Sequence, residues 1–233
     1  MNDKNEVFRH ELKYYISYEQ KDIQITKLKE LMRVDPNAQK EGYLIRSLYF
    51  DDYKNSAYED KLNGLSERKK YRIRIYDGSD KYIKLECKRK KGNYIYKESI
   101  PLTRLETEQI VNGEYRFLLQ RSESLCHKFY ISCNSEILRP KVIVDYQRIP
   151  YIYDVGTVRI TFDQHIRAGL GSYNIFDNNI PTVDVIDENK LIMEVKYTEY
   201  LPQSIKSILI QDSGEYTAAS KYCMCFEEIE KLY

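Results

Sequence analysis

Lysine and arginine side chains alternate with apolar side chains in the stretch 70–76. Lys70, Arg72 and Arg74 are separated from one another by apolar residues, which are Tyr71, Ile73 and Ile75. Because successive side chains of a β-strand point to opposite faces, this spacing predicts a strand with one cationic and one apolar face. A row of cations either faces solvent or binds an anion, and phosphate oxygens are well suited to charge-assisted hydrogen bonds from such side chains.

Four further segments have the same alternation of charged and apolar residues. Their charged positions are Arg9, Glu11 and Lys13, then Lys84, Glu86 and Lys88, then Arg159, Thr161 and Asp163, and finally Glu194 and Lys196. If these segments belong to one sheet, their charged rows form a surface that is rich in Lys and Arg and holds a few carboxylates. Carboxylates on such a surface are hard ligands for a divalent cation that bridges phosphate oxygens.

The composition of the chain excludes several other kinds of site. The 233 residues contain 37 Lys and Arg against 36 Asp and Glu, so binding of nucleic acid through bulk positive charge is not expected. The five cysteines show no Cys-x-x-Cys spacing, which argues against a disulfide framework or structural zinc. The three histidines are scattered along the chain, so a histidine-based triad has little support.

Hydropathy favours a cytoplasmic protein. No apolar run approaches the length of a membrane span, and the N-terminal residues Met1 to Glu6 are too polar for a secretory signal. We therefore expect no membrane segment in this chain.

The elements that must position the charged rows are about eight strands, most of them joined as hairpins. Strands are expected near residues 7–16, 43–50, 70–76, 81–89, 94–100, 141–149, 156–165 and 191–197. The predicted fold class is α+β and mainly antiparallel β, as a single domain over residues 1–233. An open sheet with a charged outer face is one architecture, and an eight-stranded closed β-barrel with surrounding helices is the other. Eight strands enclose an interior just wide enough for side chains or one small ligand.

Helices are expected between these strands. Ser17 and Gln20 form a capping box for a helix that ends near Arg33, and Asp51-Asp52 can cap a short helix that closes at Gly64. Residues 103–131 predict two helices, and Pro202 fits the first turn of another. A final helix is expected to bury Ala219, Cys223, Phe226 and Ile229, with Lys221 off that stripe.

Six blocks, in order along nearly the whole chain, resemble the VTC polyphosphate polymerase domain of the triphosphate tunnel metalloenzymes. The blocks are Phe8-Arg9-His10-Glu11-Leu12-Lys13-Tyr14, Ser47-Leu48-Tyr49-Phe50-Asp51, Tyr71-Arg72-Ile73-Arg74, Asp145-Tyr146-Gln147-Arg148, Met193-Glu194-Val195-Lys196-Tyr197 and Ser220-Lys221-Tyr222.

This resemblance implies a β-tunnel whose basic residues bind the triphosphate of ATP or a polyphosphate chain. The residues carried over as catalytic are Arg72, Arg74, Arg148, Arg159 and Lys221. Those carried over as substrate-binding are Lys13, Lys88, Lys97, Tyr146, Lys196 and Ser220. Glu194 is implied as the ligand of Mn²⁺ or Mg²⁺, with Glu11 as a second candidate.

The sequence departs from the family pattern in three respects. Arg9 stands where the wider superfamily often has a glutamate, which removes one metal ligand. Ala218 and Ala219 precede Ser220-Lys221 where another basic residue can occur. The eukaryotic polymerases also carry a regulatory domain and a membrane segment, neither of which is expected here, so a membrane protein is a candidate partner.

Four functions remain open from the sequence. The leading expectation is synthesis of inorganic polyphosphate from ATP, and hydrolysis of triphosphates is the second. A non-catalytic module that binds polyphosphate or nucleotides is the third, and a structural sheet with solvated charges is the fourth. ATP and polyphosphate or triphosphate are the expected ligands, and nucleic acid is not. Purely structural roles also remain possible for several of these residues. Glu11 with Lys13 and Glu194 with Lys196 would form ion pairs, Lys221 would be an exposed helix lysine, and Tyr146 would lie in the core.

Overall fold

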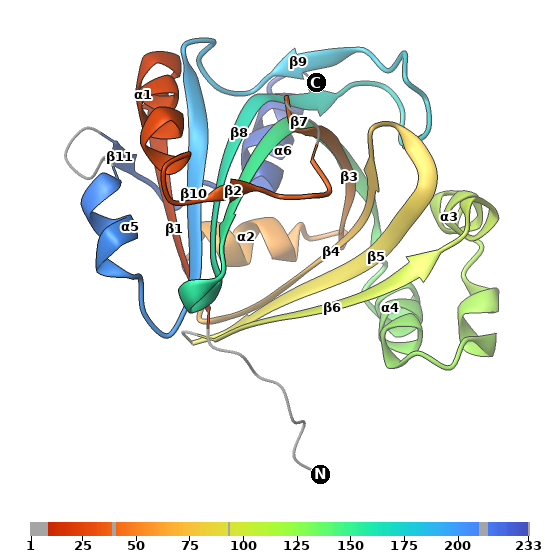
Figure 1. The fold of residues 1–233 in the computed structure, drawn as a ribbon. Coiled ribbons are helices and arrows are strands. Elements are labelled where there is room, and N and C mark those ends of the chain that lie inside the picture. The colour runs from red at the N-terminus through yellow and green to blue at the C-terminus, as the bar shows by residue number, and fades with distance from the viewer. Residues whose placement is uncertain (1–8, 39–40, 93, 210–213, 233) are drawn as a thin grey trace. The chain divides into compact units, whose positions relative to one another are not determined.

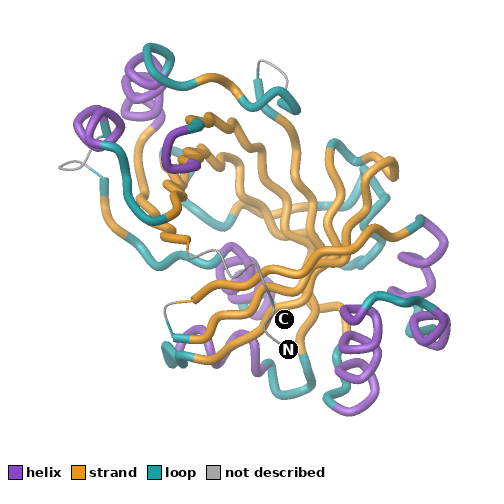
Figure 2. Tube along the Cα trace, turned by 60° about the horizontal axis from the view of Figure 1, so that its bottom comes forward, coloured by secondary structure: helices purple, strands orange, loops and turns teal. Residues whose placement is uncertain are grey.

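The computed structural model describes residues 9–38, 41–92, 94–209 and 214–232, apart from the side chain of Arg9. The trace contains more strand than helix, and the helices occur as short segments (Figure 2). Contacts between residues group the chain into two units. Unit 1 comprises Met1–Leu44, Tyr146–Ile166 and Asp184–Ser220, and unit 2 comprises Ile45–Asp145, Arg167–Val183 and Lys221–Tyr233. Among the described residues, four strands pass through both units: β3 (Tyr43–Asp51), β7 (Arg139–Tyr153), β8 (Val158–Gly169) and β9 (Thr182–Asp184).

Unit 1 is built on an antiparallel sheet. Strand β1 (Arg9–Ser17) pairs with β10 (Lys190–Thr198), which pairs in turn with β8. The short strand β11 (Glu215–Tyr216) pairs with β1, and β2 (Arg33–Val34) pairs with β7. The remaining elements of this unit are α1 (Tyr18–Leu28), α5 (Gln203–Ile208) and the 3₁₀ turn η2 (Val155–Thr157), while β9 (Thr182–Asp184) crosses the boundary between the units.

In unit 2 the antiparallel strands pair in the order β3, β4 (Glu67–Tyr76), β5 (Ser79–Lys91) and β6 (Tyr94–Leu102). Strands β4, β5 and β6 lie side by side in Figure 1. The helical elements of this unit are α2 (Ser56–Leu62), α3 (Arg104–Val111), η1 (Arg116–Gln120), α4 (Ser124–Ser135) and α6 (Lys221–Glu230).

Local sequence signals explain where several elements begin. The predicted capping box is confirmed, because the Ser17 hydroxyl accepts from the Gln20 amide and the Gln20 side chain accepts from the Ser17 amide. The acidic pair also caps α2 as expected. Asp51 accepts from the amides of Ala57 and Tyr58, and Asp52 accepts from that of Ser56.

The hairpin between β4 and β5 turns at Asp77 and Gly78. Both residues have positive φ angles, 52° and 64°. This conformation matches the type I′ turn, whose twist fits that of the flanking strands and which favours Asp-Gly.

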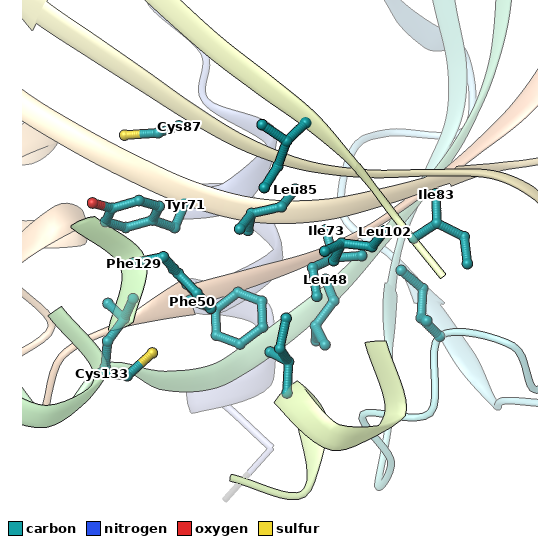
Figure 3. Packing of buried hydrophobic residues seen from close by; sticks show 14 of the residues in the cluster. Leu48, Phe50, Tyr71, Ile73, Ile83, Leu85, Cys87, Leu102, Phe129 and Cys133 are labelled. Carbon is teal, nitrogen blue, oxygen red and sulfur yellow. The ribbon is translucent and has the colours of Figure 1, made fainter. Parts of the chain in front are cut away.

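Each unit has its own apolar core. In unit 2 the apolar faces of β4 and β5 pack with residues of α4, and Phe129 lies 5.3 Å from Phe50 and 5.2 Å from Tyr71 between ring centroids (Figure 3). In unit 1 the core includes Ile16, Leu28, Val158, Ile160, Phe162, Leu191, Met193, Val195 and Ile205. Every buried side chain of this kind contributes roughly 1.5 to 3 kcal/mol relative to an exposed one.

The fold class is confirmed as α+β with mainly antiparallel sheet. About eight strands were predicted; within the part of the chain that the structure describes, eight strands have nine or more residues and three more are short. The pairings within each unit form an open sheet, so the closed barrel is not confirmed. Val7 and Phe8, at the start of the first predicted strand, lie outside the described residues. None of the described helices has both the length and the apolar character required to cross a bilayer.

Two expectations about helices were wrong. Helix α1 ends at Leu28 rather than near Arg33, because Arg33 and Val34 pair with β7 as strand β2. Helix α6 begins at Lys221, so Ala219 precedes it. Lys221 is buried, at 8% exposure, and not a solvent-facing helix lysine.

Candidate functional site

Charged side chains of unit 2 share one face of its sheet. On this face, which we call the basic face, the strand register places eight Lys and Arg residues and one carboxylate on β4, β5 and β6. They are Arg68, Lys70, Arg72, Arg74, Lys84, Lys88, Lys90 and Lys97, with Glu86. The opposite face carries Tyr71, Ile73, Ile75, Ile83, Leu85 and Cys87, all of them buried. The alternation predicted for these two strands is therefore confirmed.

Three lysines stand directly opposite one another across the basic face. Lys70 of β4 faces Lys88 of β5, which faces Lys97 of β6. Like charges directly opposite in a sheet are destabilising. The register thus confirms that Lys88 and Lys97 share a face with Arg72, as the family resemblance requires.

Glu86 is the counter-charge of the basic face, and it is 1% exposed. Its Oε2 atom accepts from Nε of Arg72 at 2.7 Å, and its Oε1 atom lies 2.5 Å from Nζ of Lys97. Burial by itself raises the pKa of Glu86, but the charges of Arg72, Arg74 and Lys97 outweigh burial and lower this pKa to about 2. Glu86 therefore stays ionised and fixes the orientation of the Arg72 guanidinium.

Tyr49 of β3 holds Arg72 from the other side. Nη1 of Arg72 donates to the Tyr49 hydroxyl at 2.8 Å, and the Tyr49 ring stacks on Tyr222 of α6 at 5.2 Å. Burial raises the pKa of the Tyr49 phenol, but the positive charges of Arg72 and Arg74 outweigh burial, so this pKa is lowered. The direction of this shift reflects a surplus of positive charge around a buried side chain.

Arg74 and Lys221 are the other predicted catalytic residues of unit 2. Arg74 is buried and its Nε donates to the Ser47 hydroxyl at 3.2 Å. Lys221 is the first residue of α6. Burial raises the pKa of the Cys225 thiol, and the positive charge of Lys221 offsets part of this rise.

Carboxylates and cations alternate on the corresponding face of unit 1, which we call the mixed face. Cross-strand rows run from β1 through β10 to β8. One row is Glu11, Lys196 and Arg159, and the next is Lys13, Glu194 and Thr161. The predicted site residues of these three strands are thus brought together on one face.

Glu194 is buried, at 4% exposure, among three cations of unit 1. Its Oε2 atom lies 2.5 Å from Nζ of Lys196 and 3.4 Å from Nη2 of Arg148, and its Oε1 atom lies 3.6 Å from Nζ of Lys13. The same Lys13 ammonium is 3.2 Å from Oε1 of Glu11. Two carboxylates therefore converge on one ammonium group.

Arg148 of β7 is oriented by Asp163 of β8, which is fully buried. Nε and Nη2 of Arg148 each donate to a separate oxygen of Asp163 at 2.6 Å. Its guanidinium also lies 5.2 Å from the ring centroid of Tyr146. The Arg148 backbone packs so closely on Gly42 that a Cβ atom there would lie 2.0 Å from the Arg148 carbonyl oxygen. Gly42, with φ +85°, is the residue that permits this approach.

Arg159 and Ser220 complete the predicted set in unit 1. Nη1 of Arg159 lies 2.7 Å from Oδ2 of Asp35, and Nη2 donates to the Tyr43 hydroxyl at 3.1 Å. Burial raises the pKa of Asp35, but hydrogen bonds from Asn37 and the charge of Arg159 outweigh it, so the pKa is lowered. Ser220 lies immediately before α6 and is partly buried.

The donor set of the mixed face fits a divalent cation in a limited way. Glu11 and Glu194 offer hard oxygen ligands within reach of one cationic group, which is the Lys13 ammonium. Among the described residues, no cluster of three or more His, Cys, Asp or Glu side chains forms a metal site by itself. Mg²⁺ is commonly held by one or two carboxylates together with substrate phosphates, so these two carboxylates suffice for that mode of binding.

Other carboxylates in the motif blocks have structural roles. Asp51 accepts from the Tyr222 hydroxyl at 2.5 Å in addition to capping α2, and Asp145 makes a bidentate pair with Arg46 at 2.8 Å. The purely structural interpretation of Glu11 and Glu194 is also correct in part, because Glu11 pairs with Lys13 and Glu194 pairs with Lys196. Tyr146 is buried, as a core residue would be, yet it lies against Arg148.

Three residues that shape these faces were missing from the predicted site: Glu86, Asp163 and Tyr49. The first two belong to the alternating charged rows of their strands, which is the signal that could have identified them. Tyr49 gave no such signal, because its role depends on the register between β3 and β4.

Comparisons with known proteins identify the family of this chain and proteins that share its fold. The model of the VTC domain family matches residues 8–229. Among solved structures, HpAC1 from Hippeastrum, described as a candidate adenylyl cyclase with a dominant triphosphatase activity, is 12% identical. The match has a TM-score of 0.53 and covers 94% of this chain and 96% of that chain.

A second similar structure is a candidate adenylate cyclase from Vibrio parahaemolyticus. It is 12% identical, with a TM-score of 0.51, and the match covers 97% of this chain and 99% of that chain. At this level of identity the likeness shows a shared fold. A search of curated protein sequences finds no match. Because the family model spans nearly all of the sequence, the chain belongs to the VTC domain family.

Proposed function

We propose that this chain is a divalent-metal-dependent phosphotransferase that acts on triphosphates and synthesises inorganic polyphosphate from ATP. The observation that carries the proposal is the basic face of unit 2, where eight cations accompany one buried carboxylate. Membership of the VTC domain family supports the same class of substrate.

The charge imbalance on the basic face favours a polyanionic ligand. Lys70, Lys88 and Lys97 stand directly opposite one another on adjacent strands, where a phosphate chain would accept charge-assisted hydrogen bonds from them. Each such bond contributes roughly 1.5 to 3 kcal/mol. A chain of phosphates supplies several oxygens in succession and thus suits a surface with several rows of cations.

The arginines are oriented before any ligand arrives. Glu86 and Tyr49 hold Arg72, and Asp163 holds Arg148, through hydrogen bonds of 2.6 to 2.8 Å. Fixed donors of this kind stabilise charge that develops during phosphoryl transfer without a cost of reorganisation. We propose that Arg72, Arg74 and Lys221 of unit 2, and Arg148 and Arg159 of unit 1, act on non-bridging phosphate oxygens. Lys13, Lys88, Lys97, Tyr146, Lys196 and Ser220 are proposed as binding residues.

The metal would be held by Glu194 and Glu11. Bound Mn²⁺ or Mg²⁺ supplies charge neutralisation at the transferring phosphate. The attacking group in polyphosphate synthesis is a terminal phosphate that is already anionic, so the residues have no proton to remove from it. Their task is to align the two phosphates and to exclude water.

Hydrolysis of triphosphates is the second candidate. It is favoured by the similarity in fold to HpAC1, for which a dominant triphosphatase activity is described. In that reaction water attacks instead of phosphate, and Glu11 could orient the water. A module that binds polyphosphate or nucleotides without turnover is the third candidate, and a membrane protein remains a candidate partner.

The test is to incubate the purified protein with ATP and Mn²⁺ and to follow long-chain polyphosphate and free phosphate together. Polyphosphate as the main product supports the proposal, whereas free phosphate alone favours the triphosphatase. Arg74→Ala should lower the activity about 100- to 1,000-fold, and Arg104→Ala should leave it unchanged, because Arg104 is an exposed residue of α3. Activity in Arg74→Ala equal to that of the wild type would contradict the assignment of the basic face.

A further inference from the structure

One buried hydroxyl on the mixed face has no hydrogen-bond partner. Thr161 of β8 is fully buried, at 0% exposure. Within the described residues of unit 1, its Oγ1 is the one buried side-chain nitrogen or oxygen atom without a hydrogen-bond partner. Folded proteins pair nearly all such atoms, since an unpaired buried hydroxyl is destabilising. A bound ligand that contacts this hydroxyl would supply the missing interaction.

The strand register places Thr161 beside the carboxylate proposed to bind the metal. Thr161 stands directly opposite Glu194 of β10, which stands directly opposite Lys13 of β1. Directly opposed residues of an antiparallel pair project from the same face with their Cβ atoms roughly 4.5 to 5.5 Å apart. The Thr161 hydroxyl thus lies on the same face as Glu194, one strand away.

The charges around Glu194 explain why a neutral ligand fits here. Its oxygens already face the cations Lys13, Lys196 and Arg148, at distances of 2.5 to 3.6 Å. Two protein carboxylates leave further coordination positions on a divalent cation, which substrate phosphates, water or another protein oxygen would fill. A hydroxyl adds an oxygen without adding charge, and it is a ligand type that Mg²⁺ accepts at other phosphate sites.

We infer that the hydroxyl of Thr161 supplies a third oxygen ligand to the divalent cation that Glu194 and Glu11 bind. The inference rests on the proposed function, because it assumes that the metal binds at Glu194. It explains both the unpaired Oγ1 atom and its place opposite that carboxylate.

The test is Thr161→Val, which keeps the shape of the side chain and removes the hydroxyl. Mn²⁺ affinity is measured by calorimetry and by the electron paramagnetic resonance signal of unbound Mn²⁺, without ATP. We expect about tenfold weaker Mn²⁺ binding, in the range seen when a supporting group of a metal site is removed. The melting temperature of the metal-free protein should not fall, because the lost hydroxyl had no hydrogen-bond partner.

Thr107→Val is the matched control. Thr107 is also fully buried, but its hydroxyl donates to the carbonyl of Thr103 at 2.9 Å. This variant should lower the melting temperature and leave Mn²⁺ affinity unchanged. Thr161→Ser keeps the hydroxyl and should bind Mn²⁺ like the wild type, so it also covers the case in which Thr161→Val fails to fold.

The outcomes separate the two proposals. If Glu194→Gln weakens Mn²⁺ binding but Thr161→Val does not, the role of Thr161 is overturned and the metal site remains. If Glu194→Gln binds Mn²⁺ as the wild type does, the metal site of the proposed function fails. Equal weakening in Thr161→Ser and Thr161→Val would also overturn the role of the hydroxyl.

Discussion

On the mixed face of unit 1 each cation lies next to a carboxylate, whereas on the basic face of unit 2 eight cations share one. Lys13 lies between Glu11 and Glu194, Arg148 is paired with Asp163, and Arg159 with Asp35. On the basic face Glu86 is the carboxylate, and it contacts Arg72 and Lys97. The two faces have the same alternating strands but different balances of charge.

Under the proposed function, this difference means that the mixed face binds the metal and the basic face binds phosphate. A face in which carboxylates and cations alternate is nearly neutral, and it can exchange a protein cation for a metal ion. On a face with a large surplus of Lys and Arg, binding of a polyanion neutralises the excess positive charge. In both faces a buried carboxylate orients an arginine, Asp163 for Arg148 and Glu86 for Arg72. A buried carboxylate thus fixes the orientation of an arginine guanidinium on each of the two faces.

The largest expected effect is a loss of ATP turnover, and the two faces should differ in whether added Mn²⁺ restores it. Arg74→Ala and Glu194→Gln should each lower turnover of ATP about 100- to 1,000-fold, the usual cost of removing one group that stabilises developing charge. Raising Mn²⁺ should partly rescue Glu194→Gln but not Arg74→Ala. Initial rates over a Mn²⁺ series check this, and rescue of both variants would erase the distinction between the faces.

The next effect concerns stability against pH. The pKa of Glu86 is about 2 in the folded protein against 4.5 for an ordinary glutamate. The folded-state pKa is the lower one, so this stabilisation is present above about pH 4.5 and is lost as the pH falls toward 2. The difference corresponds to about 3 kcal/mol.

Glu86→Gln should therefore lower the free energy of unfolding by about 3 kcal/mol at pH 7 and flatten its decline between pH 4.5 and 2. Urea unfolding at several pH values measures both quantities. A Glu86→Gln protein as stable as the wild type at pH 7 would mean that Glu86 does not balance the basic face.

A smaller effect, on the affinity for tripolyphosphate, is expected from a substitution of Lys88 on the basic face. Lys88→Ala should weaken binding of tripolyphosphate about tenfold, the equivalent of one charge-assisted hydrogen bond. Calorimetry measures this affinity, and thermal unfolding checks that the variant is folded. Binding as tight as that of the wild type would contradict the assignment of Lys88 to the phosphate site.

The smallest effect is expected away from both faces. Arg33 pairs with Asp154 at 2.9 Å, but both side chains are largely exposed. Arg33→Ala should change the free energy of unfolding by less than about 0.5 kcal/mol, as exposed ion pairs usually do. Urea unfolding at pH 7 sets this baseline, and a change as large as that of Glu86→Gln would remove the contrast between buried and exposed pairs.

Features set by neighbouring residues could be predicted from the sequence. The faces of β4, β5, β8 and β10, the capping box at Ser17 and the Asp77-Gly78 turn all follow from short-range spacing. The charged positions of the site follow from the same alternation, and the family resemblance selected most of them.

Features set by distant residues could not be predicted. The choice of Asp35 for Arg159 depends on how segments far apart in the chain approach one another. The choice of Asp163 for Arg148 depends on the pairing between β7 and β8. Burial of Lys221 and the early end of α1 have the same origin, since tertiary contacts outweigh helical periodicity there. The closed barrel stays a prediction for this reason.

The most direct test of the central claim is calorimetric titration of tripolyphosphate into the protein in the presence of EDTA. The account predicts metal-independent binding to the wild type and to Arg104→Ala, and little or none to Arg74→Ala. Absence of binding to the wild type, or equal binding to Arg74→Ala, would contradict the claim that the basic face exists to hold a phosphate chain.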